Sequence, residues 1–93
     1  MVKLKSIKPS TRADKKLMAE FDDGTTTHFG AKGMDDYTLT GDKDARERYR
    51  TRHRKDLATR DPRRAGFLSF YILWGDSTSR QQNIREYKSR FNL

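Results

Sequence analysis

Ninety-three residues, of which 32% are apolar and 37% charged, are enough for one domain with a single small core. The formal net charge is +8 and there is no cysteine, which excludes disulfides and thiolate zinc sites. No apolar run follows Met1, and the longest apolar stretch, 67–74, is far shorter than the ~20 residues that a membrane span needs. We therefore expect a folded domain that is neither secreted nor embedded in a membrane.

The N-terminal third is predicted to form a small antiparallel sheet of three strands. Residues 2–8 carry apolar side chains with lysines between them, and Pro9 ends this run. Two further extended runs, 16–22 and 25–29, flank Asp23-Gly24. An Asp-Gly pair in this position indicates a hairpin with a type I′ turn, because both residues tolerate positive φ. Since three strands need a helical layer over one face, we predict an α+β fold with about three helices covering the sheet.

Residues 30–41 are a connector rich in glycine and acidic residues, and a basic helix is predicted to follow it. Asp42 has the character of an N-cap, and the acids early and arginines late in the next residues suit the helix dipole. These signals predict a helix over 42–57. Three apolar residues of the connector are expected to pack on the core: Met34, Tyr37 and Leu39.

Two more helices are predicted in the C-terminal part. Asp61-Pro62 is expected to open the first one, which runs to about Trp74 and ends at Gly75. Its apolar residues lie on nearly every side, which is typical of a helix buried in the middle of a domain. The last helix is expected to begin at Asp76 or Ser77. The chain is thus interpreted as one domain, 1–93, with a sheet region (1–29), the connector (30–41) and a helical region (42–93).

Charge is distributed unevenly along the chain. Residues 43–64 carry ten Lys or Arg and four Asp or Glu, and so contribute +6 of the total charge of +8. A basic block on a short domain indicates a polyanionic partner. Only Thr51 is available on the predicted helix to contact base edges, so we expect contacts to the nucleic-acid backbone without sequence specificity. The predicted nucleic-acid-binding residues are Lys43, Arg46, Arg48, Arg50, Arg54, Lys55, Arg60, Arg63 and Arg64.

Helical spacing divides the side chains of this predicted helix into faces. One narrow face carries Ala45, Tyr49, Arg52 and Asp56. A cationic ridge at i,i+4 spacing is formed by Arg46, Arg50 and Arg54. An alternative interpretation is a solvated face laced by internal ion pairs. The lysines of the N-terminal run either form a second basic patch or protect an edge strand from pairing. These lysines are Lys3, Lys5, Lys8, Lys15 and Lys16.

Few residues are candidates for catalysis. The turn-like run 30–33 lacks the spacing of a phosphate-binding loop. Asp22-Asp23 and Asp35-Asp36 could hold Mg²⁺ in a nuclease, but hairpin and capping roles explain them better. Trp74 is assigned to the core in preference to a base-stacking surface. We therefore expect a non-enzymatic protein with no metal and no cofactor, and a metal-dependent nuclease is the remaining enzyme alternative.

Five segments resemble one protein family. They are FDDG (21–24), HFGAKGMDDYT (28–38), KDARERYRTRH (43–53), DPRRAGFLSFYILWG (61–75) and YKSRFNL (87–93). Together they resemble the short basic proteins encoded by nucleo-cytoplasmic large DNA viruses, from Leu17 to the C-terminus. The resemblance implies a viral protein associated with the virion or the interior of the infected cell, and it carries no established activity.

The basic block and this resemblance together lead to two expectations. The first is a non-enzymatic protein that binds the nucleic-acid backbone, DNA before RNA, and organises or condenses DNA in the virion. The alternative is a minor capsid or internal structural protein of the virion that docks on acidic protein surfaces. The oligomeric state is left open.

Overall fold

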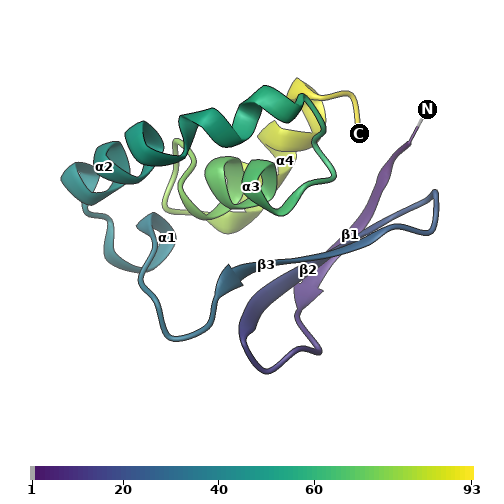
Figure 1. Cartoon of the computed structure of the whole chain (residues 1–93), viewed down its shortest axis with the longest axis horizontal. Coiled ribbons are helices and arrows are strands. Elements are labelled where there is room, and N and C mark those ends of the chain that lie inside the picture. The colour runs from purple at the N-terminus through teal and green to yellow at the C-terminus, as the bar shows by residue number, and fades with distance from the viewer. Residues whose placement is uncertain (1) are drawn as a thin grey trace.

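The computed structural model describes residues 2–93 and consists of a three-stranded sheet beside a layer of helices (Figure 1). The sheet is antiparallel, in the order β1-β2-β3, and lies in the N-terminal third. This confirms the predicted α+β fold. The strands are β1 (Leu4–Pro9), β2 (Lys15–Phe21) and β3 (Thr26–Ala31). The helices are α1 (Tyr37–Thr40), α2 (Lys43–His53), the 3₁₀ helix η1 (Arg54–Thr59), α3 (Ala65–Leu68), the π-helical segment η2 (Ser69–Leu73) and α4 (Arg80–Arg90).

The first strand contains an irregularity that explains its uneven apolar spacing. Leu4 pairs with Phe21 while Ser6 pairs with Glu20, so Lys5 is one extra residue on β1. Such a bulge shifts the alternation of side chains by one position. Leu4 is buried and the strand resumes its pairing beyond the bulge at Ser6.

The hairpin lies at Asp23-Gly24 as predicted, but the predicted type I′ turn is wrong. A type I′ turn needs positive φ at both central residues, but only Gly24 has it here, with φ +89°. Asp23 does not, since the non-glycine residues with positive φ within residues 2–93 are Arg60 and Asn92. The amide of Gly24 donates to the Phe21 carbonyl (3.2 Å), and the amide of Phe21 donates to the Thr25 carbonyl (2.9 Å). This is a three-residue loop that ends on a left-handed glycine, the next commonest way to join two strands.

The core lies between the sheet and the helices that follow η1. It joins side chains of all three strands to the C-terminal helices, and its buried members are Leu4, Ala19, Phe21, Phe29, Phe67, Leu68, Ile72, Leu73, Tyr87 and Leu93. Full burial of each large apolar side chain contributes about 1.5–3 kcal/mol. The Tyr87 hydroxyl donates to the Pro62 carbonyl, so the buried ring carries no unsatisfied polar group.

The buried apolar helix begins later than predicted and changes its pitch. Asp61 caps a turn, accepting from the Arg63 amide (3.0 Å), and the helix starts only at Ala65. Its second half widens into a π-helical turn, in which the Trp74 amide donates to the Ser69 carbonyl (3.0 Å). The predicted end at Gly75 is confirmed, because η2 ends at Leu73 and Trp74 is its C-cap. A Cβ on Gly75 would lie 2.1 Å from the Tyr71 carbonyl oxygen, so this position requires glycine.

The last helix also begins later than predicted. Ser79 is the N-cap of α4 and accepts from the Gln82 amide (3.2 Å), instead of Asp76 or Ser77. The segment between η2 and α4 is held by the buried Asn83 side chain. Its amide donates to the carbonyls of Ile72 (2.9 Å) and Ser77 (2.7 Å). A buried side-chain amide with these partners fixes the chain reversal at Gly75.

In the connector, one apolar residue of the three predicted ones packs on the core. Tyr37 is buried, but the side chains of Met34 and Leu39 are 65% and 60% exposed. The prediction for Met34 and Leu39 is wrong. Met34 lies in the turn after β3, and the single turn of α1, which ends at the left-handed Gly41, buries Tyr37 and leaves Leu39 outside. Within residues 2–93, none of the helices has the length and apolar character needed to cross a membrane.

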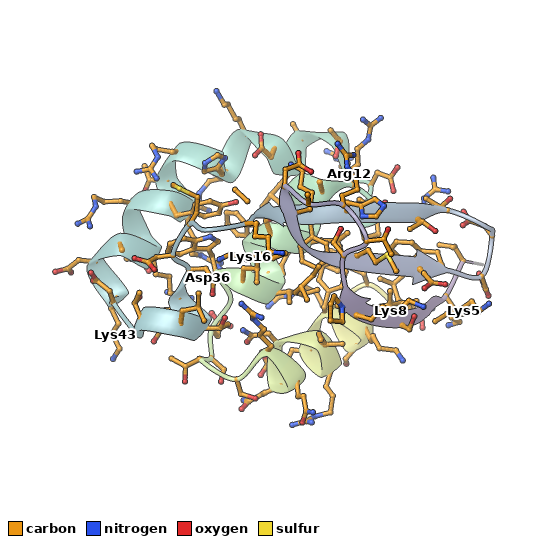
Figure 2. All side chains as sticks on the ribbon, turned by 90° about the horizontal axis from the view of Figure 1, so that it is seen from below. Lys5, Lys8, Arg12, Lys16, Asp36 and Lys43 are labelled. Carbon is orange, nitrogen blue, oxygen red and sulfur yellow. The ribbon has the colours of Figure 1, made fainter. Side chains whose placement is uncertain are left out.

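A buried carboxylate, that of Asp36, joins the connector to both layers (Figure 2). It forms ion pairs with Lys16 of β2 (2.6 Å) and Arg80 of α4 (3.3 Å). It also caps α1 by accepting from the amide and the hydroxyl of Thr38. Burial raises the pKa of this carboxyl, but the hydrogen bonds from Lys16 and Thr38 and the nearby positive charges outweigh burial and leave the pKa lowered.

We predict that Asp36→Asn lowers the free energy of unfolding by about 3 kcal/mol, because it leaves the Lys16 ammonium without its carboxylate. The neighbouring Asp35 is exposed, so Asp35→Asn should change the stability by less than about 0.5 kcal/mol. Urea denaturation of both variants measures the difference. Equal effects of the two substitutions would contradict a structural role for the Asp36 ion pairs.

Candidate nucleic-acid interface

The basic helix is positioned by a side-chain cap and an unusual continuation. Asp42 caps α2 as predicted, since its carboxylate accepts from the Ala45 amide (3.1 Å). The regular helix ends at His53, and the chain continues as the 3₁₀ helix η1 to Thr59. Arg60, with φ +55°, then reverses the chain. The predicted helix over 42–57 is therefore an α-helix followed by a 3₁₀ segment.

The face of α2 that meets the rest of the domain matches the predicted narrow face only in part. Its half-buried side chains are those of Ala45 and Tyr49, as predicted, together with Arg46, Arg50 and His53. Asp56, beyond the end of α2, is also half-buried, while Arg52 is exposed. Two of the predicted phosphate-binding arginines thus point inward. The apolar signal of this helix is weak because its inner face is built largely from arginine and aromatic side chains.

Arg46 and Arg50 bind carbonyl oxygens at the end of η2. The Arg46 Nε donates to the Gly75 carbonyl (2.7 Å), and its remaining nitrogens pair with Glu47 and Asp76 at 2.6 Å each. Arg50 donates to the Trp74 carbonyl (2.9 Å), and its guanidinium lies 4.2 Å from the centroid of the Phe70 ring. These contacts occupy both guanidinium groups, so we remove Arg46 and Arg50 from the candidate interface.

Arg63 is also engaged within the chain. It pairs with Asp61 (3.1 Å) and with Asp23 in the hairpin loop (2.7 Å), and so joins the sheet to the turn before α3. Hydrogen bonds with Thr25 and Arg63 lower the pKa of Asp23 to about 2. Arg64 is only loosely paired with Asp61 (3.9 Å), and its side chain is exposed.

Five of the predicted residues remain directed outward. All five side chains are exposed, and within residues 2–93 none of them donates a hydrogen bond or forms an ion pair. We call this set the outer basic surface: Lys43, Arg48, Arg54, Lys55 and Arg60. A rise of 1.5 Å per residue gives α2 alone a length of ~16 Å, which is enough to follow several phosphates.

Two of the N-terminal lysines, Lys5 and Lys8, lie far from this surface (Figure 2). Figure 2 shows Lys43 at one end of the molecule and Lys5 and Lys8 near the other. Lys8 is paired with Glu20 (2.6 Å) and Lys16 with Asp36 (2.6 Å). Lys5 and Lys8 are therefore separated in space from the outer basic surface (Figure 2), and Lys16 is held by a buried carboxylate of this chain.

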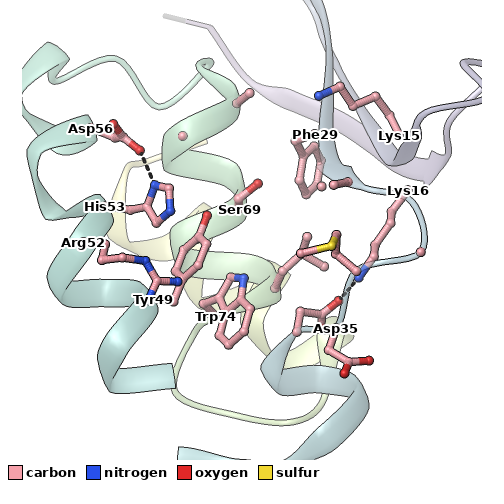
Figure 3. Close-up of a pocket in the computed structure, with 18 residues that line it drawn as sticks. Lys15, Lys16, Phe29, Asp35, Tyr49, Arg52, His53, Asp56, Ser69 and Trp74 are labelled. Carbon is pink, nitrogen blue, oxygen red and sulfur yellow. Dashed lines mark hydrogen bonds and ion pairs between the residues drawn. The ribbon is translucent and has the colours of Figure 1, made fainter. Parts of the chain in front are cut away.

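A groove lies beside α2, between the ends of β2 and β3 and the helical layer (Figure 3). Its volume is about 660 Å³. Four rings line it, those of Phe29, Tyr49, His53 and Trp74. Three of them are stacked: Tyr49 stacks on Trp74, with centroids 4.5 Å apart and planes 9° apart, and on His53 at 4.2 Å and 25°. His53 is further paired with Asp56 (3.1 Å). Burial raises the pKa of the Tyr49 hydroxyl, and a hydrogen bond with Ser69 opposes this shift.

Sequence reasoning missed this groove. Trp74 packs against the core as predicted, but it is only half-buried and also lines the groove. The available signal was the i,i+4 spacing of Tyr49 and His53, which places both rings on one side of α2. The cations at the groove, Arg52 and Lys15, come from opposite sides of it (Figure 3).

The runs that were candidates for catalysis, residues 30–33, 22–23 and 35–36, include residues that make structural contacts. The Met34 amide donates to the Ala31 carbonyl (3.2 Å), so a turn follows β3, as expected for this glycine-rich run. Asp23 and Asp36 are both held by cations of this chain. Within the described residues, no group of three or more His, Cys, Asp or Glu side chains is arranged to hold a metal ion.

Comparison with known proteins gives one match. A protein-family model described as a family of unknown function (DUF5754) matches residues 5–53, which is more than half of the chain and covers the sheet, the connector and α2. No curated protein and no solved structure matches.

We predict that Arg50→Met lowers the free energy of unfolding by about 2 kcal/mol, because it removes a charged hydrogen bond to the Trp74 carbonyl and the contact with the Phe70 ring. Arg48→Met, on the outer face of the same helix, should cost less than about 0.5 kcal/mol. Chemical denaturation measures both. If Arg48→Met were the more destabilising of the two, the assignment of inner and outer arginines would be wrong.

The lowered pKa of Asp23 predicts a loss of stability in acid. The carboxylate has a pKa of about 2 in the folded state and an ordinary value of 3.8, so its contribution is complete above about pH 4 and is lost as the pH falls toward 2. Asp23→Asn should flatten the stability profile in this window. Arg63→Met should retain most of the decline, because the Thr25 amide is the largest cause of the shift. Thermal unfolding between pH 2 and 5 tests this, and an unchanged profile in Asp23→Asn would refute it.

Proposed function

The chain belongs to the DUF5754 family of unknown function, and we propose that it is a non-enzymatic protein that binds nucleic-acid backbones through the outer basic surface. The observation that carries this proposal is that the five cations of the outer basic surface are exposed and have no hydrogen-bond or ion-pair partner among the described residues. Unpaired cations on one rigid segment attract a polyanion and release its counterions on binding.

The chemistry of the surface favours phosphate over base edges. Three of its five members are arginines, whose planar fork of donors matches phosphate oxygens. Thr51 is the one exposed side chain of α2 that could contact bases as a small hydroxyl. Backbone contacts of this kind give binding without sequence preference. We therefore propose a role in organising or condensing DNA.

The setting that we propose is viral. The run 43–53, one of the segments that resemble the short basic proteins of large DNA viruses, is α2 itself. In this setting the DNA would be the viral genome, in the virion or in the infected cell. This part of the proposal rests on the resemblance of the sequence alone.

A second candidate function is docking on an acidic protein of the virion. The specific observation that favours it is the exposure of Met34 and Leu39, two large apolar side chains in the segment that leads into α2. Apolar residues beside a cationic surface suit a protein partner better than a nucleic-acid backbone. Recovery of the protein with the shell after nuclease and salt treatment of particles would favour this candidate, and recovery with the genome would favour the first.

We predict that affinity for a fluorescently labelled DNA duplex falls with salt, with a log–log slope of roughly −4 to −5 for about five phosphate contacts. The double variant Arg54→Ala/Lys55→Ala should bind roughly tenfold or more weakly, and its slope should be shallower by about two. Fluorescence anisotropy titrations at several salt concentrations measure both quantities.

The matched control is Arg85→Ala/Lys88→Ala on α4, which removes the same charge from two other exposed positions. This control should retain a slope close to that of the unsubstituted protein. Absence of binding at low salt, or equal losses in the two double variants, would overturn the proposed interface.

A further inference from the structure

We propose that the groove beside α2 binds an unstacked base of single-stranded nucleic acid, with the adjoining phosphates held by Arg52 and Lys15. The inference rests on the proposed function for its class of ligand, and it adds a second mode of binding to the outer basic surface. It is carried by three features of the groove: its aromatic wall, its charge and its place beside a π-helical segment.

The aromatic wall is continuous. Tyr49 stacks with both Trp74 and His53, and all three rings line the groove. Rings that are packed against one another lose little conformational freedom when a base joins them, so the wall is already organised for a planar ligand. Aromatic side chains interact with every type of base, since each base has a π-face.

The unpaired charge at the groove is mostly positive. Arg52 is exposed and Lys15 half-buried, and neither side chain has a hydrogen-bond or ion-pair partner among residues 2–93. Figure 3 places Arg52 and Lys15 on opposite sides of the groove. The other charged lining residues form internal pairs, Lys16 with Asp36 and His53 with Asp56, which leaves Asp35 as the unpaired acid. A phosphate on either side of a seated base therefore meets a cation.

The π-helical segment η2 helps to shape the groove. Ser69, Leu73 and Trp74 belong to the turn closed by the Trp74-to-Ser69 hydrogen bond, and all three line the groove. Insertion of an extra residue into a helical turn is uncommon and frequently marks a functional site. The groove volume of about 660 Å³ lies within the range of small-ligand sites. This volume is larger than one base alone requires.

Trp74 is the single tryptophan of the chain, so its fluorescence reports on the groove. The experiment titrates the full chain with a short oligothymidylate and, separately, with a duplex of equal length, and follows both tryptophan emission and anisotropy of the labelled DNA. We expect saturable quenching by the single strand and little change in emission with the duplex.

Two variants with surface substitutions separate the groove from the outer basic surface. Lys15→Ala/Arg52→Ala should weaken the single strand roughly tenfold and leave duplex binding within about twofold. Arg48→Ala, one turn from Arg52 on α2, should weaken single strand and duplex alike and preserve the quenching. Tyr49→Leu removes the ring that lies between His53 and Trp74 and holds them in place, so it should lower single-strand affinity by about 5-fold or more.

The outcomes distinguish this inference from the proposed function. Duplex and single strand bound equally, without quenching, would overturn the groove as a base site and leave the outer basic surface standing. Quenching that Arg48→Ala abolishes and Lys15→Ala/Arg52→Ala preserves would also overturn it. Absence of binding by either form of DNA at low salt would overturn the proposed function, and the inference with it.

Discussion

The buried carboxylate of Asp36 is the contact on which the arrangement of this small domain depends. It joins Lys16 of the sheet, Thr38 of α1 and Arg80 of α4, three segments that are far apart in the sequence. Because α1 is only four residues long, its direction is set by this cap and by the left-handed Gly41 that ends it. The next residue, Asp42, caps α2, so the orientation of the basic helix follows from the same junction. The groove lies beside this junction as well, since Lys16 and Asp36 line it.

The second organising feature is the division of the arginines into two groups. A domain with 32% apolar residues has too little apolar surface to cover every element, and α2 has no fully buried side chain. Its inner face instead uses the stems and guanidinium groups of Arg46 and Arg50, which contact aromatic rings and satisfy carbonyls at the end of η2. Arginine can serve in this way because its apolar stem packs while its fork donates to several acceptors. The same residue type on the outer face has no such acceptors, and is available to phosphate.

The sequence predicted the parts of the fold that depend on local signals. The α+β class, the position of the hairpin at Asp23-Gly24 and the Asp42 cap follow from turn chemistry, capping and periodicity, which act over a few residues. The type of the hairpin turn was wrong, since the same Asp-Gly pair also fits a three-residue loop that ends on glycine. The π-helical segment η2 packs against α4, where the Asn83 side chain donates to the Ile72 carbonyl. No local sequence pattern predicts this contact.

For the candidate site, sequence reasoning found the basic segment but could not divide its arginines. Arg46 and Arg48 are the same residue type in the same basic segment. They differ only in the carbonyl and carboxylate groups that the folded chain brings near them. Gly75 and Asp76, the partners of Arg46, lie about thirty residues away and reach it only through the tertiary fold. The aromatic groove was not predicted for a similar reason. Tyr49 lies on α2 and Trp74 at the end of η2, so their rings stack only in the folded chain.

The central claim is that the outer arginines of this segment, and not the inner ones, meet nucleic acid. The most direct measurement is a titration of isotopically labelled protein with a short DNA duplex, in which the Nε–Hε resonances of the arginine side chains are followed by NMR. We expect the resonances of Arg48, Arg54 and Arg60 to shift with the added DNA, while those of Arg46 and Arg63 stay in place. Shifts confined to Arg85 and Arg90 of α4, with the resonances of α2 unchanged, would contradict it.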